Sequence, residues 1–147
     1  MIDGIIFDLD GTLWDSTDKV AVSWNQVILE ETGEDPGYTG TILKSHFGKI
    51  MPEIAAAMFP QLPKEEGWAL LTKCMERENE DLLAKPGTCY PYLEEVLKEL
   101  SANYPLFIVS NCQGGYVEAF LEVTKLGVYV KDQLCSGDTG NPKADNI

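Results

Sequence analysis

Basic residues are scarce in this chain of 147 residues, which has 11 lysines and arginines against 24 aspartates and glutamates. The formal net charge of −13 leaves no basic surface to neutralise phosphates, so we expect neither nucleic acid nor an anionic membrane as a partner. A small anionic substrate would also be repelled unless a cation lay between it and the protein. The charge balance therefore favours a divalent metal if the substrate is anionic.

Histidine and closely spaced cysteines are scarce too. His46 is the single histidine, and Cys74, Cys89, Cys112 and Cys135 form no CxxC pair, which argues against a zinc site. The N-terminus shows no signal peptide, and no apolar run reaches the roughly 18 residues of a membrane span. We therefore expect free thiols in the reducing cytoplasm. The oligomeric state is not indicated by the sequence.

The apolar residues that are present, 44% of the chain, suffice for a packed core. Short apolar runs at residues 4–9 and 105–109 are typical of buried strands in a parallel sheet, and residues 133–136 predict a third strand. One helical pattern is expected from a cap at Ser16 or Thr17 until Gly33, and further ones over 39–46, 52–59, 64–83, 92–100 and 116–125. A loop is expected at 137–142, and a further helix is expected to begin near Lys143.

The order of these elements predicts an α/β fold with an open parallel sheet. Residues 1–14 and 85–147 are expected to form its core. Residues 15–84 have a purely helical pattern and are expected to form an insertion after the first strand. The insertion would cover the edge where the strands end.

Polar residues follow both apolar strands, and ligands bind outside the carboxyl ends of the strands of such sheets. Asp8, Asp10, Ser110 and Asn111 are therefore expected at one edge. Two carboxylates so close together favour a proton or a metal between them, and magnesium prefers such hard oxygen ligands. One carboxylate could attack phosphorus and the other could transfer protons, while Gly11 lets the backbone approach a phosphate.

An isolated Asp-x-Asp is more often an ordinary strand end, Ser110 alone an ordinary turn residue, and Lys143 alone a solvated lysine. Their order along one chain changes that interpretation. Residues 7–16, FDLDGTLWDS, resemble the first motif of the haloacid dehalogenase superfamily. Residues 107–111, FIVSN, are similar to its second motif, and residues 141–147, NPKADNI, to its third.

The resemblance implies a Rossmann-like core with an inserted helical cap, as in phosphoglycolate phosphatases and β-phosphoglucomutases. It implies that Asp8 is the nucleophile and a magnesium ligand, and that Asp10 is the general acid and base with its carbonyl on magnesium. Ser110 and Lys143 would hold the phosphate, together with Gly11, Thr12 and Asn111. The expected function is magnesium-dependent hydrolysis of a small phosphorylated metabolite, because dehalogenases of the superfamily lack the second aspartate.

The family has a fourth motif, an acidic pair on a later strand that completes the magnesium shell. No Asp or Glu follows Asp145 here. We therefore expect a truncated chain that lacks the last strands of the sheet, binds magnesium weakly and turns over poorly.

Substrate choice in this family belongs to the cap. His46 and Lys49 lie where the specificity loop is expected and would contact a substrate hydroxyl and anion, although a half-exposed histidine and a solvated lysine are the more ordinary interpretations. Trp14 could face the substrate or pack under the cap. Trp24, Trp68, Phe47 and Phe59 are expected in core and cap–core contacts. Cys112 is expected to be a small packing residue rather than a nucleophile.

Three alternatives stay open. A phosphosugar mutase would return the phosphoryl group to a sugar instead of water. A phospho-receiver domain is disfavoured, because such domains carry the acceptor aspartate on the third strand without a helical insertion. A catalytically impaired or regulatory relative is favoured if the native protein ends at Ile147.

Overall fold

The computed structural model describes residues 2–147 and divides into two compact units. The core unit consists of the residues up to Asp15 together with Thr88–Ile147. The helical unit consists of Ser16–Gly87. Each unit has its own buried residues.

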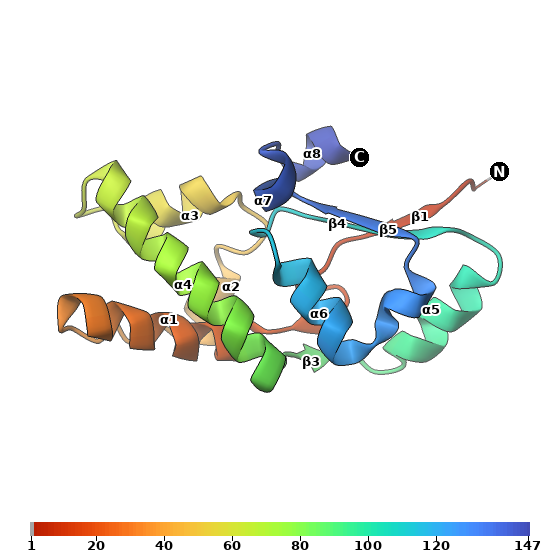
Figure 1. Cartoon of the computed structure of the whole chain (residues 1–147), viewed down its shortest axis with the longest axis horizontal. Helices are drawn as coiled ribbons and strands as arrows, with labels where there is room; N and C mark the ends of the chain where they lie inside the picture. Colours follow the sequence, from red (N-terminus) through yellow and green to blue (C-terminus); the bar gives the residue numbers. More distant parts are fainter. Residues whose placement is uncertain (1) are drawn as a thin grey trace. The chain divides into compact units, whose positions relative to one another are not determined.

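The core unit contains a parallel sheet of three strands in the order β1 (Ile5–Phe7), β4 (Leu106–Ser110) and β5 (Asp132–Cys135) (Figure 1). Phe7 pairs with Ile108, and Ser110 pairs with Cys135. The strands predicted from the apolar runs are confirmed, and so is the α/β class. Since all three strands run in the same direction, the residues that follow them emerge at one edge of the sheet.

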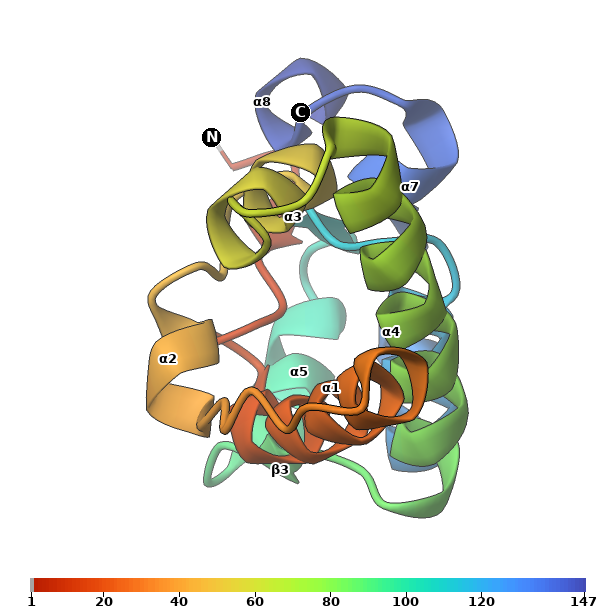
Figure 2. The same cartoon turned by 90° about the vertical axis from the view of Figure 1, so that its left-hand side faces the viewer.

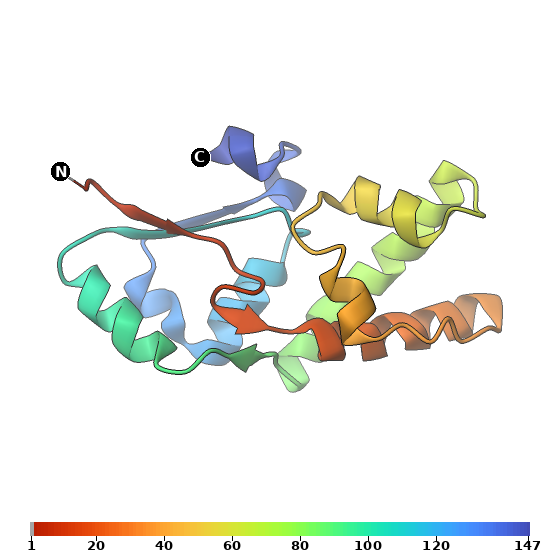
Figure 3. The same ribbon diagram turned by 180° about the vertical axis from the view of Figure 1, so that it is seen from behind.

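Helices lie on both faces of this sheet. On one face are α5 (Leu93–Ser101), α6 (Tyr116–Thr124) and the 3-10 helix η1 (Leu126–Tyr129), and on the other are α7 (Ser136–Thr139) and α8 (Lys143–Asn146) (Figures 1 and 3). Leu97, Ile108 and Phe120 are fully buried between the layers. The prediction of a loop over 137–142 was wrong in its first part, because α7 occupies Ser136–Thr139. A single turn of helix is too short to leave a periodic apolar signal.

A second, antiparallel pair joins β2 (Trp14–Asp15) to β3 (Thr88–Cys89) (Figure 3). The sequence placed Asp15 at the start of the helical insertion, and the structure places it in a strand instead. Two-residue strands have no measurable period, so the tertiary pairing alone reveals them.

The helical unit consists of α1 (Thr17–Thr32), α2 (Gly40–Lys44), α3 (Met51–Met58) and α4 (Lys64–Ala84). The four predicted helices are confirmed, and α1 ends at Gly33, which adopts the left-handed φ of 80° that suits glycine. Helices α1 and α4 pack against each other at an angle (Figure 2). Their buried residues include Trp24, Leu70, Leu71 and Leu82.

Polar contacts inside the helical unit join the same two helices. Glu78 of α4 is only 3% exposed, and its carboxylate accepts a hydrogen bond of 2.6 Å from Nε1 of Trp24 on α1. Ser23 donates a bond of 2.7 Å to Asp81.

Phe59 is buried as predicted, but Trp68 is 41% exposed and does not belong to the core of this unit. Across residues 2–147, no helix combines the length and the apolar character that crossing a bilayer requires.

Candidate active site

Asp8 and Lys143 meet at the edge where the strands of the core unit end. Asp8 is the first residue after β1, and Lys143 is the first residue of α8. Lys143 Nζ lies 2.9 Å from Asp8 Oδ1, with 26% of the lysine side chain and 42% of the aspartate side chain exposed. The contact places a cation beside a carboxylate that solvent can still reach, which is the environment that a nucleophile for an anionic substrate needs.

Asn111 explains why Lys143 is held at this point. Its Oδ1 accepts a hydrogen bond of 2.6 Å from the main-chain N–H of Lys143 and one of 2.8 Å from the hydroxyl of Ser136. Asn146 donates to Thr139 Oγ1 at 3.0 Å, which ties α8 to the end of α7. One amide oxygen at the end of β4 therefore fixes the starts of α7 and α8. Asn111 Oδ1 already accepts these two hydrogen bonds from within the protein, so a contact between Asn111 and phosphate stays a prediction.

Ser110 is the last residue of β4 and is only 4% exposed. Its Oγ accepts a hydrogen bond of 3.2 Å from the N–H of Cys112. The parallel register brings Ser110 to the same edge of the sheet as Asp8. Ser110 thus lies at the strand end where a phosphate oxygen is expected, and its contact with phosphate stays a prediction.

Cys112 is buried, as predicted for a packing residue. Its hydrogen bond with Cys135 and its burial both raise the pKa of the Cys112 thiol. The same bond lowers the pKa of Cys135, against the opposing effect of burial. A buried thiol with a raised pKa is a poor nucleophile, so the thiol next to Ser110 does not compete with Asp8.

The turn after Asp8 is closed by main-chain hydrogen bonds. Leu9 is fully buried, and Gly11 has a φ of 76°, which a side chain would strain. The N–H of Gly11 donates to the carbonyl of Trp14 at 2.9 Å, and the N–H of Thr12 donates to that of Leu9 at 3.1 Å. These two N–H groups therefore build the turn, and phosphate binding by Gly11 and Thr12 stays a prediction.

Asp10 has a partner that the sequence did not reveal. The hydroxyl of Tyr116, the first residue of α6, donates a hydrogen bond of 2.6 Å to Asp10 Oδ1. The helical pattern predicted over 116–125 begins at Tyr116, and this position at the start of the helix was the available signal. A tyrosine before an apolar stripe is common, so the pattern alone could not assign it a function.

The donor chemistry at this edge suits magnesium. Asp8 offers a carboxylate and Asp10 a main-chain carbonyl, both hard oxygen donors. No group of three or more His, Cys, Asp or Glu side chains with metal-site spacing occurs in residues 2–147. Since magnesium keeps several waters and binds substrate phosphates, two protein donors are compatible with it, although they make only part of its shell.

His46 and Lys49 lie in the helical unit, between α2 and α3. His46 Nδ1 is buried and lacks a hydrogen-bond partner within residues 2–147. Burial lowers the pKa of His46, and the positive charge of Lys49 lowers it further. Contact of these two side chains with substrate stays a prediction, because they belong to a different unit from Asp8.

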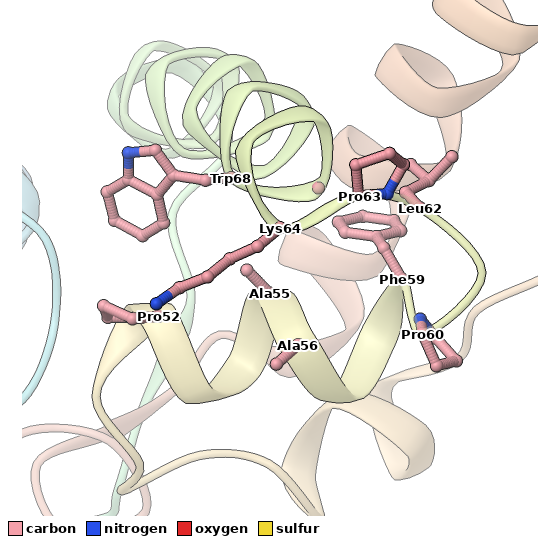
Figure 4. Close-up of a pocket in the computed structure, with 10 residues that line it drawn as sticks. Pro52, Ala55, Ala56, Phe59, Pro60, Leu62, Pro63, Lys64 and Trp68 are labelled. Carbon is pink, nitrogen blue, oxygen red and sulfur yellow. The ribbon is translucent and has the colours of Figure 1, made fainter.

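The helical unit also contains an apolar pocket of about 470 Å³ between α3 and the first turn of α4 (Figure 4). Phe59, Pro60 and Trp68 line it, and Lys64 extends along it (Figure 4). None of the residues expected to act on a phosphate lines this pocket. All of its lining residues belong to the helical unit.

Comparison with known proteins places these observations in a family. The family model described as haloacid dehalogenase-like hydrolase matches residues 5–147. A phosphoglycolate phosphatase of Aquifex aeolicus (strain VF5) is 29% identical over 139 residues. The match covers 95% of this chain but 62% of the relative, so the chain spans less than two thirds of that protein.

Solved structures share the fold. A predicted phosphatase from Clostridium acetobutylicum has a TM-score of 0.76 at 19% identity, over 99% of this chain and 68% of the other. A predicted phosphoglycolate phosphatase from Haemophilus somnus 129pt has a TM-score of 0.75 at 22% identity, over 92% of this chain and 63% of the other. The Rossmann-like arrangement expected from the motifs is therefore confirmed.

Proposed function

The chain belongs to the haloacid dehalogenase-like hydrolases, and we propose that the protein containing it hydrolyses small phosphate monoesters through an aspartyl-phosphate on Asp8. The contact of 2.9 Å between Lys143 and Asp8 carries this proposal. It joins the first and third motifs, which are more than 130 residues apart in the sequence. A lysine beside a half-exposed aspartate favours an ionised nucleophile and attracts a phosphate.

In the first half of the reaction, an Asp8 carboxylate oxygen forms a bond to phosphorus while the bond from phosphorus to the leaving oxygen breaks. Asp10 gives its proton to that leaving oxygen, and the product alcohol departs. Lys143 and Ser110 stabilise the oxygens of the transferring group. Because the nucleophile and Lys143 are already in contact, little reorganisation is needed at this step.

In the second half, a water oxygen forms a bond to phosphorus and the bond from phosphorus to Asp8 breaks. Asp10, now ionised, accepts the proton of that water, and inorganic phosphate leaves. Both protonation states of Asp10 are used once in each cycle. Magnesium, held by Asp8 and the carbonyl of Asp10, would supply positive charge that offsets the repulsion between the acidic protein and its substrate.

The core unit makes this charge compensation necessary. Its 12 acidic residues face only four lysines, which gives a net charge of −8. One of those four lysines is Lys143 at the candidate site. A phosphorylated substrate therefore depends on Lys143 and a divalent cation for its attraction.

Mass spectrometry after acid quenching during turnover tests the covalent step. The proposal predicts a phosphorylated peptide that contains Asp8, formed only with magnesium, and phosphate released to water. Phosphoglycolate is included in the substrate panel because the relative from Aquifex aeolicus bears its name. Return of the phosphoryl group to a sugar phosphate would favour the mutase alternative. Phosphate release without a modified Asp8 peptide would contradict the mechanism. The cytoplasmic location stays a prediction.

A further inference from the structure

Tyr116 is buried in the core unit but ends in a polar contact. Its side chain is 1% exposed, and its hydroxyl donates a hydrogen bond of 2.6 Å to Asp10 Oδ1. Bonds from a hydroxyl to a carboxylate are typically about 2.5–2.7 Å and about twice as strong as neutral ones. The contact is therefore of the kind that holds a carboxylate in one orientation.

The ring of Tyr116 is itself held in place. Trp14 packs against it edge-on, with ring centroids 5.8 Å apart, and also packs edge-on against Phe120 at 5.1 Å. Tyr116 starts α6 directly after Gly115, whose left-handed φ of 84° turns the chain into the helix. A buried ring with aromatic neighbours has few alternative positions, so its hydroxyl has few as well.

The same tryptophan also holds the turn that carries Asp10. The carbonyl of Trp14 accepts the N–H of Gly11 at 2.9 Å, and Trp14 forms a backbone bridge with Asp10. Trp14 therefore contacts both the turn that carries Asp10 and the ring of Tyr116. The turn positions the backbone of Asp10, and Tyr116 positions its carboxyl group.

We infer that Tyr116 is a positioning residue for Asp10, which it orients for proton transfer to the leaving oxygen of the substrate. The inference rests on the proposed function. Tyr116 keeps its own proton throughout, while the proton that moves belongs to Asp10.

Two substrates with different leaving groups test the inference in the full-length protein. Nitrophenolate departs without a proton, whereas an alkoxide needs one, so an acid that is badly placed affects alkyl phosphates most. For Tyr116→Phe we expect kcat/KM for glycerol phosphate to fall about tenfold or more. For nitrophenyl phosphate we expect a loss of less than about threefold. An equal loss for both substrates would overturn the inference.

Tyr129→Phe is the matched control. The hydroxyl of Tyr129 donates to Glu94 at 3.3 Å on the outer side of the same unit, so its removal deletes a tyrosine hydroxyl without touching Asp10. We expect unchanged kcat/KM for both substrates. In an Asp10→Asn background, Tyr116→Phe should cause no further selective loss for the alkyl phosphate, and a fully additive loss would contradict the inference.

Folding and function can be separated. If Tyr116→Phe does not fold by circular dichroism, a fluorotyrosine at position 116 keeps the ring and the hydroxyl but changes the strength of the donor, and the ratio of the two kcat/KM values should still change. An unchanged ratio would overturn the inference. If the wild-type protein hydrolyses both esters but Tyr116→Phe does not change the ratio of the two kcat/KM values, this inference alone is overturned. A wild type that hydrolyses neither defeats the proposed function and this inference together.

Discussion

The core unit and the helical unit have the same number of acidic residues, 12 each, but differ in their cations and in where their polar groups lie. The helical unit has seven basic residues, of which Lys73 and Arg77 pair with Glu31 and Glu30 of α1 on its surface. The core unit has four lysines, and one of them contacts Asp8. Surface ion pairs thus join α1 to α4 in the helical unit, whereas in the core unit one lysine contacts the candidate nucleophile.

Buried polar groups differ in the same way. In the helical unit, Glu78 is buried against Trp24, a contact that joins α1 to α4. In the core unit, Tyr116 is buried against Asp10, and Asn111 holds the start of α8. The first kind of contact joins two helices, whereas under the proposed function the second kind would orient side chains toward a substrate. Substitutions should therefore affect stability in one unit and turnover in the other.

The largest expected effect is the loss of turnover in Asp8→Asn. An amide cannot form the aspartyl-phosphate, so we expect the rate of phosphate release to fall by at least about a thousandfold with little change in thermal unfolding. Asp35→Asn in the helical unit is the control, since its Oδ1 accepts the N–H of Gly37 and an asparagine retains that oxygen. Asp8→Asn activity within about tenfold of wild type would contradict the nucleophile assignment.

Lys143→Met should have the next largest effect. It removes the cation beside Asp8 but keeps the main-chain bond to Asn111, so α8 should still start at the same place. We expect kcat/KM to fall about a hundredfold to a thousandfold, as for the loss of other groups that stabilise transition-state charge. Stability should change by less than about 1 kcal/mol, because the pair is partly exposed. Lys131→Met, in an exposed loop of the same unit, should leave kcat/KM unchanged, and an equal loss there would indicate a general field effect.

Trp24→Phe tests whether the buried polar contact between Trp24 and Glu78 stabilises the helical unit. It leaves the buried carboxylate of Glu78 without its indole donor, which should cost about 1–3 kcal/mol of unfolding free energy in urea. Turnover per folded molecule should stay near the wild-type value. Trp68→Phe is the same change at an exposed position of the same unit, and it should cost less than about 0.5 kcal/mol. Equal costs for the two variants would show that the contact with Glu78 contributes nothing.

His46 should produce the smallest effect, through pH. Burial and then the charge of Lys49 lower the pKa of His46 in the folded protein. The unfolded chain therefore takes up this proton first as the pH falls below about 6.5, so the contribution of His46 to stability is complete above that pH and declines toward the folded pKa. NMR titration should give a midpoint below that of free histidine, and Lys49→Met should raise it. A midpoint at or above the free value would contradict the burial of Nδ1.

Much of the fold could be predicted from the sequence, because strands and helices longer than about four residues leave a periodic apolar pattern. The run at 105–109 and the helical stretch at 64–83 appear as β4 and α4 almost residue for residue. The pairing of β2 with β3 and the single turn of α7 could not be predicted, since elements of two to four residues leave no period. Trp68 was misplaced because an aromatic residue at helical spacing can also line an open pocket.

The sequence by itself determined the α/β class, the order of the elements and the three motifs that identify Asp8, Ser110 and Lys143. The tertiary structure decided which atoms those residues contact. Lys143 Nζ contacts the Asp8 carboxylate, and the main-chain N–H of Lys143 donates a hydrogen bond to the amide oxygen of Asn111. The hydroxyl of Tyr116 donates a hydrogen bond to Asp10. Such contacts join residues 32 to 135 positions apart. They depend on strand register and on the exact geometry of tight turns, which a pattern of apolar and polar residues does not specify.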